Sequence, residues 1–479
     1  MEIVPLDNSV QAEITVPGSK SITNRALILA ALAEGETTLQ GALWSEDTEV
    51  MVDCLRDLGF MVNLEPDINE PCNRTITVYG KGGVVPSGGT EAQPLELFVG
   101  NAGTAARFLA AFVCLGKGVY RLHGVPRMHE RPQAELFSAL RQLGYRVEAE
   151  NNNEKLPARI LVGSLSALQT DSEPTGRRPV ATCSVSIEQS SQFASALLLS
   201  ANVGNWNVRI EGENAEESPY VSMTSELIKA FPKQGGTFQI EPDASSGSYF
   251  LAVRWLVPPK EHVEKNSDQF GISIQTVQPG RVSVANWPTS GWQVDQKFNE
   301  VWDLKTDISL GLWSSWQLPR SNKSSGMHEV SAEFTVSRTQ DLGDSIMTLI
   351  VLAPFAKSPI RFTDLGRLRL QECERVFALR TELTKCGAKI IETGDVLEVF
   401  PSHLHGAEIE TYSDHRMAMC FAILGLKVPG IKIKNPACVK KTFPNFFQKL
   451  AAAPPHGLGT RIRDANTSRT LDHEELFAQ

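Results

Sequence analysis

One short pattern recurs at distant points of the chain: the end of a helix, a glycine, and then an alternating strand. It occurs around Gly59, Gly144 and Gly387 as LRDLGFMV, LRQLGYRV and LTKCGAKI, with a looser copy over 227–238. Glycine suits the left-handed conformation that ends many helices, and the alternating apolar residues after it predict a strand. This turn occurs in α/β proteins of every kind, but widely separated copies favour an α/β fold that is built from repeated units.

The length of the chain predicts more than one domain. It has 479 residues, and single hydrophobic cores stop growing at roughly 250–300 residues. The net charge of -9 argues against a nucleic-acid partner, which requires a basic face. The same charge still allows a local basic cleft for an anionic small molecule.

Membrane and redox signals are weak. No apolar run approaches the ~20 residues of a membrane span, and the N-terminal sequence MEIVP resembles neither a signal peptide nor a transit peptide. The eight cysteines are scattered without a C-x-x-C pair, which indicates reduced thiols and argues against a zinc site. We therefore expect a cytoplasmic protein with no membrane partner and no metal.

Two motifs of the first half place polar residues at predicted helix starts. In PGSKSITNR a Gly-Ser turn delivers Lys20 and Ser21 to a helix N-terminus, where backbone N–H groups favour an anion. An ordinary Ser21 cap beside a solvated Lys20 is the alternative. In QSSQF, over 189–193, hydroxyls and an amide precede an apolar helix and suggest donors to an oxyanion, or simply a variant capping box.

Two further segments of the first half suggest anion binding. The small residues of LFVGNAGTAAR, over 97–107, allow a ligand to approach the backbone closely. Arg127 and Arg131 share a Pro-bounded loop, and paired guanidinium groups suit phosphate or carboxylate recognition. The alternative for this loop is a surface ion pair with Glu130.

The second half mixes acidic and basic residues at successive predicted helix starts. Asp344, Arg375 and Asp414 each stand near the beginning of an apolar helical segment. An aspartate at such a position is usually a cap, so each one singly has a structural explanation. Their combination with cations points to chemistry instead.

In collinear order from Pro17 to about Leu450, these motifs resemble the 5-enolpyruvylshikimate-3-phosphate synthase family. The sequences that carry the resemblance are PGSKSITNR, LFVGNAGTAAR, PRMHERP, SSQF, DASSGSY, DHRMAM and KTFP. The resemblance implies transfer of the carboxyvinyl group of phosphoenolpyruvate to the 5-hydroxyl of shikimate-3-phosphate. Addition and elimination through a tetrahedral intermediate release phosphate, with no cofactor.

The implied reaction agrees with the charges in these motifs. Each substrate carries one carboxylate and one phosphate, and each charge-assisted hydrogen bond to such a group contributes roughly 1.5–3 kcal/mol. The motifs supply the cations Lys20, Arg25, Arg107, Arg127, Arg375, Arg416 and Lys441.

The resemblance also implies the site residues. Those for shikimate-3-phosphate are Lys20, Ser21, Arg25, Ser190, Ser191, Gln192, Ser218, Tyr220, Asp344, Arg367 and Gln371. Those for phosphoenolpyruvate are Lys20, Asn101, Gly103, Arg127, Gln192, Arg375, Arg416 and Lys441. In catalysis, Asp344 would accept the hydroxyl proton, Glu372 would protonate the methylene carbon, and Lys20 would share the proton work.

The chain departs from the family pattern at a few positions. Gln371 stands where the family often has lysine, and Arg367 where it often has asparagine, so we hypothesise that Arg367 replaces the missing lysine. The segment around Ser218 is one residue shorter than in the family. Phe108 replaces a common proline, beside the pocket for phosphoenolpyruvate and its mimic glyphosate.

The implied fold is a two-domain inside-out α/β barrel with three βαβαββ repeats per domain and the active site in the interdomain cleft. One domain would span 20–242 and the other 1–19 with 243–455, so that the chain crosses near residues 18–20 and 242–244. We expect insertions within 257–330, a poorly ordered polar tail over 456–479, and a monomer.

Two alternatives remain open. A related enolpyruvyl transferase acts on UDP-N-acetylglucosamine, but it typically carries a loop cysteine and lacks the PGSKS and SSQ motifs. A non-catalytic homologue could bind the same anions, and Gln371 makes it conceivable. The presence of both carboxylates and all the arginines argues against it.

Overall fold

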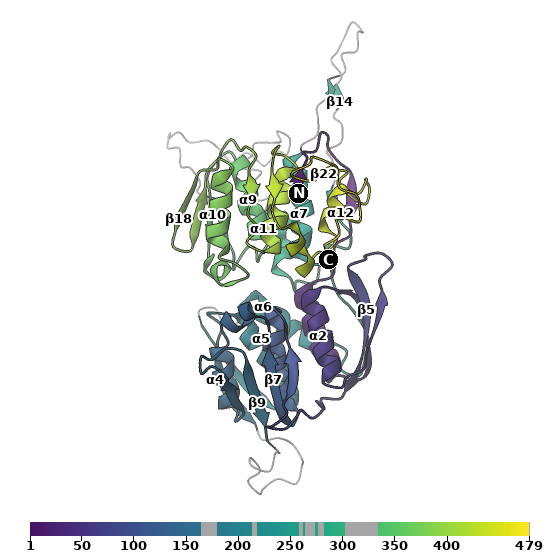
Figure 1. Cartoon of the computed structure of the whole chain (residues 1–479), viewed down its shortest axis with the longest axis vertical. Coiled ribbons are helices and arrows are strands. Elements are labelled where there is room, and N and C mark those ends of the chain that lie inside the picture. Colours follow the sequence, from purple (N-terminus) through teal and green to yellow (C-terminus); the bar gives the residue numbers. More distant parts are fainter. Residues whose placement is uncertain are drawn as a thin grey trace, which may run out of the picture.

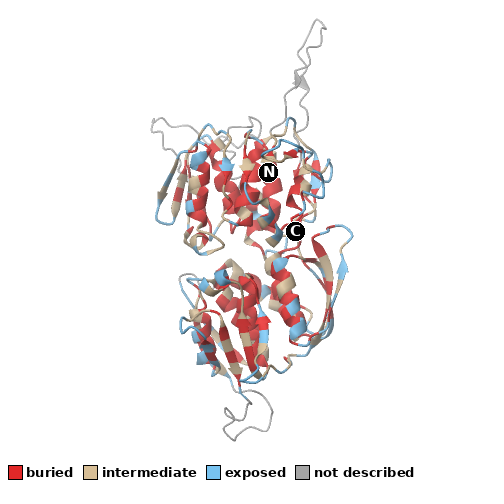
Figure 2. Cartoon of the chain, viewed as in Figure 1, coloured by how far each residue is buried: buried red, intermediate tan, exposed pale blue. Residues whose placement is uncertain are grey.

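The computed structural model describes residues 1–163, 180–212, 218–257, 262–263, 274–275, 282–301 and 334–478. This part of the chain forms two lobes that are stacked along the long axis of the molecule (Figure 1). Each lobe has its own buried apolar cluster, as the colouring by burial shows (Figure 2). The first cluster runs from Ile22 to Ile240, and the second joins Ile3–Val16 to residues from Tyr249 onward. We keep the division at residues 19/20 and 242/243 as a proposal.

The first lobe contains ten strands and six α-helices among the described residues. The strands are β3 (Glu34–Leu43), β4 (Val62–Pro66), β5 (Asn73–Lys81), β6 (Leu95–Phe98), β7 (Gly118–His123), β8 (Arg146–Ala149), β9 (Ala158–Val162), β10 (Ala181–Ser186), β11 (Trp206–Glu211) and β12 (Gly236–Gln239). The helices are α1 (Lys20–Leu32), α2 (Glu46–Asp57), α3 (Gly103–Phe112), α4 (Ala134–Gln142), α5 (Ser191–Gly204) and α6 (Pro219–Ala230).

The second lobe is built in the same way. Its strands include β1 (Glu2–Ile3), β2 (Ala12–Ile14), β15 (Val282–Val284), β16 (Phe334–Ser337), β17 (Ile360–Thr363), β18 (Ile390–Thr393), β19 (Val396–Val399), β20 (Glu408–Ile409), β21 (Lys432–Ile433) and β22 (Ile462–Arg463). Its helices are α7 (Ala244–Leu256), α9 (Ile346–Leu352), α10 (Arg375–Lys385), α11 (His415–Gly425) and α12 (Phe446–Ala451), with the 3-10 turns η6 (Gly366–Leu370) and η7 (Pro436–Lys441).

Four four-stranded sheets share one pattern of strand directions. They are β12-β3-β5-β4, β6-β7-β9-β8, β16-β17-β19-β18 and β20-β21-β1-β22. In each of them the first two strands are parallel and the other neighbours are antiparallel. The parallel pairs β10-β11 and β2-β15 give each lobe a third sheet. This recurrence confirms a fold of repeated α/β units.

The repeated glycines occupy equivalent places in three of these sheets. Gly59, Gly144 and Gly387 have φ angles of +83°, +90° and +93°. Each lies between a helix (α2, α4 or α10) and the strand that follows it (β4, β8 or β18). The positive φ is the physical reason for glycine there, because a side chain disfavours that conformation.

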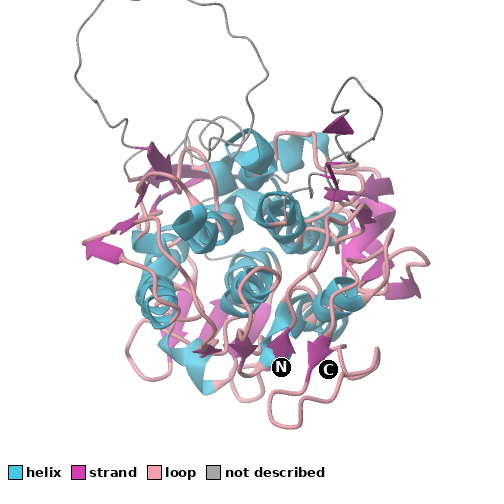
Figure 3. Ribbon diagram, turned by 90° about the horizontal axis from the view of Figure 1, so that it is seen from above, coloured by secondary structure: helices cyan, strands magenta, loops and turns pink. Residues whose placement is uncertain are grey.

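Helices lie inside each lobe and the sheets lie outside, as a view from above shows (Figure 3). In the first lobe α1, α3 and α5 pack on one another, and in the second lobe α7, α9 and α11 do so. All ten residues of α3 are buried, which explains why its sequence is apolar apart from Thr104 and Arg107. The predicted inside-out arrangement is present, with sheets that stay separate hydrogen-bonded sets in the described residues.

The sequence predicted insertions within 257–330 and a poorly ordered tail over 456–479. The expected insertions within 257–330 lie mostly outside the described residues, apart from a short antiparallel pair, β13 (His262–Val263) with β14 (Ile274–Gln275), and residues 282–301. The segment 456–478 differs from the expected loose tail. Its strand β22 pairs with β1, and Leu458, Ile462 and Leu476 are buried in the second apolar cluster.

The two lobes also touch through a buried carboxylate near the chain crossings. Glu70, in the loop between β4 and β5, is only 3% exposed. It accepts hydrogen bonds from Thr15 Oγ1 (2.9 Å) and Asn445 Nδ2 (2.7 Å), and Lys449 Nζ lies 2.8 Å away. The crossing segments are themselves joined by a bridge between Gly18 and Pro242.

Candidate active site

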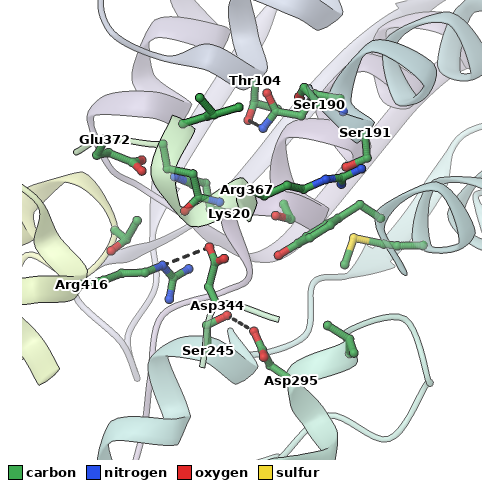
Figure 4. Close-up of a pocket in the computed structure, with 18 of the residues that line it drawn as sticks. Lys20, Thr104, Ser190, Ser191, Ser245, Asp295, Asp344, Arg367, Glu372 and Arg416 are labelled. Atoms are coloured by element: carbon green, nitrogen blue, oxygen red, sulfur yellow. Dashed lines mark hydrogen bonds and ion pairs between the residues drawn. The ribbon is translucent and has the colours of Figure 1, made fainter. Parts of the chain in front are cut away.

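The inner helices of both lobes direct their N-termini at one cavity. Its walls include residues from the first turns or caps of α1, α3, α5, α7 and α11, together with Asp344, which directly precedes the cap of α9 (Figure 4). A helix N-terminus carries partial positive charge and unpaired backbone N–H groups, so each favours an anion. The fold therefore concentrates positive potential here even though the chain is acidic.

Most of the residues that the sequence singled out line this cavity. They are Lys20, Ser21, Arg25, Ser190, Ser191, Gln192, Tyr220, Asp344, Arg367, Gln371, Glu372, Arg375 and Arg416. Lys441 lies just behind this wall, with Nζ 3.2 Å from Glu372 Oε1. Ser218 lines a second cavity that adjoins the first.

The structure places Arg127 away from the cavity. Its side chain is 53% exposed and pairs with Glu130 on the surface, as the alternative interpretation of this loop had it. Arg131 lines the cavity instead, and its Nη1 donates to the carbonyl oxygen of Asn101 (3.1 Å). A Cβ on Gly103 would stand 2.6 Å from Arg131 Nη2, so the lack of a side chain at Gly103 makes room for this guanidinium.

Asp344 stands among three guanidinium groups. Arg338 Nη2 donates to its Oδ1 (2.8 Å), while Arg416 Nε and Arg375 Nη1 lie 3.2 Å and 3.6 Å from its Oδ2. Burial alone would raise the pKa of Asp344, but Arg416, Arg338 and Arg375 outweigh burial and hold it well below its usual range.

A second buried aspartate fixes the turn that carries Asp344. Asp295 Oδ1 accepts hydrogen bonds from Gly343 N (2.6 Å), Ser345 N (3.2 Å) and Ser345 Oγ (2.6 Å). Its other oxygen accepts from Ser245 Oγ (Figure 4). Because Asp295 holds both neighbours of Asp344, the catalytic candidate is held in a single orientation.

Glu372 is the second carboxylate that contacts Arg375 in the site, after Asp344. Its carboxylate pairs with Lys441 and, at 2.8 Å, with Arg375 Nη2. Burial would raise the pKa of Glu372, but Lys441 and Arg375 lower it well below its usual range. Arg375 thus contacts Glu372 and lies near Asp344, and its Nε is anchored at 2.7 Å by the fully buried Asp414.

The first lobe contributes arginines with neutral partners. Arg25 donates to Thr224 Oγ1 (2.7 Å), Ser195 Oγ (3.0 Å) and the carbonyl oxygen of Ser21 (2.9 Å). Its guanidinium lies 5.2 Å from the ring centroid of Phe108. Burial lowers the pKa of Arg25 to about 10.

Arg107 has the same character. It donates to Gln192 Oε1 (2.8 Å) and to the carbonyl oxygens of Gly103 and Pro132, and burial lowers its pKa well below the usual value. Gln192 in turn donates to Thr104 Oγ1 (3.2 Å). The chain of contacts fixes the amide of Gln192 at the cavity wall.

Lys20 joins the two halves of the site. Its Nζ donates to Asp47 Oδ2 at 3.1 Å, and its charge helps to lower the pKa of Glu372. As the first residue of α1, it lies directly after the crossing segment.

Sequence reasoning missed several residues of the cavity wall. The main ones are Thr104, Ser245, Asp295, Arg338 and His415. Ser245 and His415 lie inside the DASSGSY and DHRMAM motifs, so their neighbours signalled them. Arg338 and Asp295 lie in no motif, and their importance emerges only from contacts with distant segments.

Among the described residues there is no cluster of three or more His, Cys, Asp or Glu side chains that could hold a metal ion. The same part of the chain contains no helix with the length and apolar character of a membrane span.

Comparison with known proteins gives a consistent result. The sequence model of the family described as EPSP synthase (3-phosphoshikimate 1-carboxyvinyltransferase) matches residues 6–450. Two relatives named 3-phosphoshikimate 1-carboxyvinyltransferase are similar over nearly their full length. The protein of Trichormus variabilis is 36% identical over 94% of this chain and 97% of its own, and that of Paraburkholderia phytofirmans is 35% identical over 92% and 96%.

The fold comparison agrees. The structure of an EPSP synthase from Acinetobacter baumannii superposes with a TM-score of 0.65, covering 94% of this chain and 97% of that one, at 20% identity.

Proposed function

The chain belongs to the EPSP synthase family, and from this membership and the geometry of the cleft we infer how it acts. The enzyme transfers the carboxyvinyl group of phosphoenolpyruvate to the 5-hydroxyl of shikimate-3-phosphate and releases phosphate. One observation carries the assignment of its site. Two carboxylates, Asp344 and Glu372, flank the single guanidinium of Arg375 at the point where the inner helix N-termini converge.

Arg375 and Arg416 are proposed to bind the carboxylate of phosphoenolpyruvate. Arg375 Nη1 is buried and has no hydrogen-bond partner among the described residues, so it can donate to a ligand. A substrate carboxylate would draw both guanidinium groups away from Asp344. The pKa of Asp344 would then rise, which makes it a better proton acceptor at the moment it is needed.

The phosphate of phosphoenolpyruvate is proposed to lie against Lys20, Lys441 and Arg131, with Arg131 in the place that the sequence had given to Arg127. Lys20 and Lys441 both act electrostatically on Glu372, which places them on the same side of the cavity. Asn101 and Gly103 support Arg131 from behind.

Shikimate-3-phosphate is proposed to bind along the first-lobe wall. Ser21 and Arg25 would hold its carboxylate, and Ser190, Ser191 and Ser218 its phosphate. Tyr220 and Gln192 would pack beside the ring, with Arg367 and Gln371 across the cleft. Since Arg25 already donates to four neutral oxygens among the described residues, its one remaining N–H is held in a fixed direction.

The proposed proton steps use the two carboxylates in turn. As the 5-hydroxyl oxygen bonds to C2 of phosphoenolpyruvate, Asp344 takes the hydroxyl proton. The bound substrate anions would draw Lys441 and Arg375 away from Glu372 and so raise its pKa, which allows Glu372 to carry a proton and give it to C3, forming a tetrahedral ketal with a methyl group. Glu372 then removes a methyl proton while the C2–O bond to phosphate breaks, which restores the vinyl group. Lys20 would share the proton transfer, and closure of the lobes would exclude water.

A phosphate-release assay tests this assignment. Wild-type protein should release phosphate with phosphoenolpyruvate and shikimate-3-phosphate, but not with UDP-N-acetylglucosamine as acceptor. Asp344→Ala and Glu372→Gln should each lower kcat by about 10²–10⁴-fold. Wild-type protein that binds both substrates without releasing phosphate would favour the binding homologue.

Three broader properties are proposed with this function. The protein would act in the cytoplasm as a monomer, and its domains would be 20–242 and 1–19 with 243–455. Sedimentation at several protein concentrations checks the monomer.

A further inference from the structure

The turn before the DHRMAM motif has an unusual backbone conformation. Tyr412 and Ser413 both have a φ angle of +54°, and the N–H of Asp414 closes the turn on the carbonyl oxygen of Thr411 (2.8 Å). Turns with two positive φ angles usually consist of asparagine and glycine, because most other side chains disfavour this conformation. A strained turn of this kind persists only where surrounding contacts hold it, and such strain is frequent at functional sites.

The turn leads directly into the second-lobe part of the active site. Asp414, the residue after the turn, is fully buried and caps α11 by accepting a hydrogen bond from Arg416 N (2.8 Å). It also accepts from Arg375 Nε (2.7 Å) and Arg375 Nη2 (3.3 Å). The conformation of the turn therefore affects the positions of both guanidinium groups that lie beside Oδ2 of Asp344.

A buried carboxylate outside the cavity wall contacts this turn. Glu382 lies on α10, which packs beside α11 in the second lobe (Figure 1), and it is 0% exposed. Its Oε1 accepts a hydrogen bond from Tyr412 Oη (2.8 Å), and its Oε2 accepts one from Glu410 N (3.1 Å). The side chain of Glu382 thus holds the turn itself and the segment that enters it.

Charge balance does not account for these contacts. A buried carboxylate is costly unless it is paired, and Lys385 Nζ lies 2.8 Å from each oxygen of Glu382. Lys385 supplies this charge without touching the turn, so the contacts with Tyr412 and Glu410 indicate a second role. Burial first, and then the hydrogen bond to Glu382, raises the pKa of Tyr412, which keeps its hydroxyl protonated and able to donate.

We propose that Glu382 is a positioning residue that keeps the turn at Tyr412 and Ser413 in its unfavourable conformation. In this way it holds Arg375 and Arg416 ready for the carboxylate of phosphoenolpyruvate. The inference rests on the proposed function of these two arginines and adds to it a residue that does not touch the substrate. Contacts of this kind lower the cost of ordering the site when the ligand binds.

Tyr412→Phe removes one hydrogen bond and leaves Glu382 paired with Lys385. The KM for phosphoenolpyruvate should rise by about three- to tenfold, because one contact that holds the turn is lost. The Kd of shikimate-3-phosphate, measured without phosphoenolpyruvate, should change by less than about twofold, because separate sites respond independently. Glu382→Ala should raise the KM for phosphoenolpyruvate by at least about tenfold, and Glu382→Gln, which keeps an acceptor for the hydroxyl, should recover part of the loss.

Ser413→Gly tests the strain directly. When it is combined with Glu382→Ala, the KM for phosphoenolpyruvate should return towards the wild-type value, because glycine adopts a positive φ readily. Lys385→Met is the matched control, since it removes the charge partner of Glu382 and leaves the contact with the turn. Its KM for phosphoenolpyruvate should stay within about twofold of wild type, whatever it does to stability. Thermal unfolding measures the stability of every variant.

The results separate the two roles of Glu382. A wild-type KM for phosphoenolpyruvate in Tyr412→Phe would overturn the proposal. Equal weakening of both substrates, or a Lys385→Met variant that behaves like Tyr412→Phe, would show that Glu382 only stabilises the lobe. Ser413→Gly that restores the melting temperature of Glu382→Ala but not its KM would also contradict the proposal. Failure of the proposed function looks different, because wild-type protein would then release no phosphate from the two substrates.

Discussion

The arginines on the two walls of the cleft differ in whether their partners are neutral or charged. On the first-lobe wall Arg25 and Arg107 donate to neutral oxygens, and burial lowers the pKa of both. On the second-lobe wall Arg375 and Arg416 stand beside carboxylates. There burial would lower the pKa of Arg375, but Asp414 and Glu372 raise it above its usual value.

This difference separates two tasks. The guanidinium groups of Arg25 and Arg107 have no carboxylate partner among the described residues, and so the first-lobe wall is prepared to receive an anion. On the second-lobe wall, Arg375 and Arg416 are balanced by nearby carboxylates, and two of these carboxylates, Asp344 and Glu372, are the proposed proton carriers. On the second-lobe wall, a substrate anion must displace carboxylates from Arg375 and Arg416. On the first-lobe wall, it binds to arginines that have no carboxylate partner in the part of the chain that the structure describes.

The largest expected contrast is in stability. Arg375→Met leaves the fully buried Asp414 without its guanidinium partner and Glu372 with Lys441 alone, so the free energy of unfolding should fall by about 3–5 kcal/mol. Arg25→Met removes a buried cation whose partners Thr224 and Ser195 already bond each other (2.9 Å), so stability should stay the same or rise. Denaturant unfolding of both variants, with exposed Arg146→Met as control, measures the difference. Equal destabilisation would contradict the comparison.

The next effect concerns Arg367, which shares a cavity with Ser218. If Arg367 replaces the lysine that Gln371 lacks, Arg367→Ala should raise the KM for shikimate-3-phosphate by at least about tenfold, because one charge-assisted contact is lost. The KM for phosphoenolpyruvate should change little. Steady-state kinetics with each substrate varied in turn decides, and an unchanged KM for shikimate-3-phosphate would refute the replacement.

A smaller effect should appear in the pH dependence of stability. The folded-state pKa of Asp344 is depressed, so the stability from its ion pairs is complete above the unfolded pKa of about 4 and is lost as pH falls below it. Asp344→Asn should therefore be less stable than wild type near neutral pH by about 1–3 kcal/mol. Unfolding curves between pH 7 and pH 3 should show this gap closing, and a constant gap would count against the ion pairs.

The smallest effect is expected at Phe108, whose ring lies beneath Arg25. Phe108→Leu keeps the apolar volume but removes the cation–π contact, worth about 0.5–1 kcal/mol. Binding of shikimate-3-phosphate should weaken by less than about tenfold. A parallel inhibition curve shows whether the change reaches glyphosate. A larger loss than this would mean that Phe108 positions α3 as well as Arg25.

Much of this structure could be predicted from short stretches of the sequence. The repeated glycines predicted turns that occur at equivalent places, because a positive φ is a property of one residue. The polar motifs before apolar segments predicted helix starts, and the structure turns those starts toward one cavity. The sequence therefore predicted the turns and helix starts that depend on one contiguous motif.

The sequence did not distinguish Arg127 from Arg131, because both lie in one loop and only packing against Gly103 selects Arg131. It also did not reveal that residues 456–478 fold back onto β1.

Sequence alone determined which residues begin helices, where the chain turns, and that the motifs carry enough cations for two doubly anionic substrates. Tertiary structure decided which of those cations are balanced and which are left for a ligand. Arg338 donates to Asp344, whose position depends on a turn that Asp295 stabilises. Arg367 donates to the carbonyl oxygen of Ile187, which lies 180 residues away in the sequence. Charge balance depends on distances between segments far apart in the chain, and no local pattern encodes such distances.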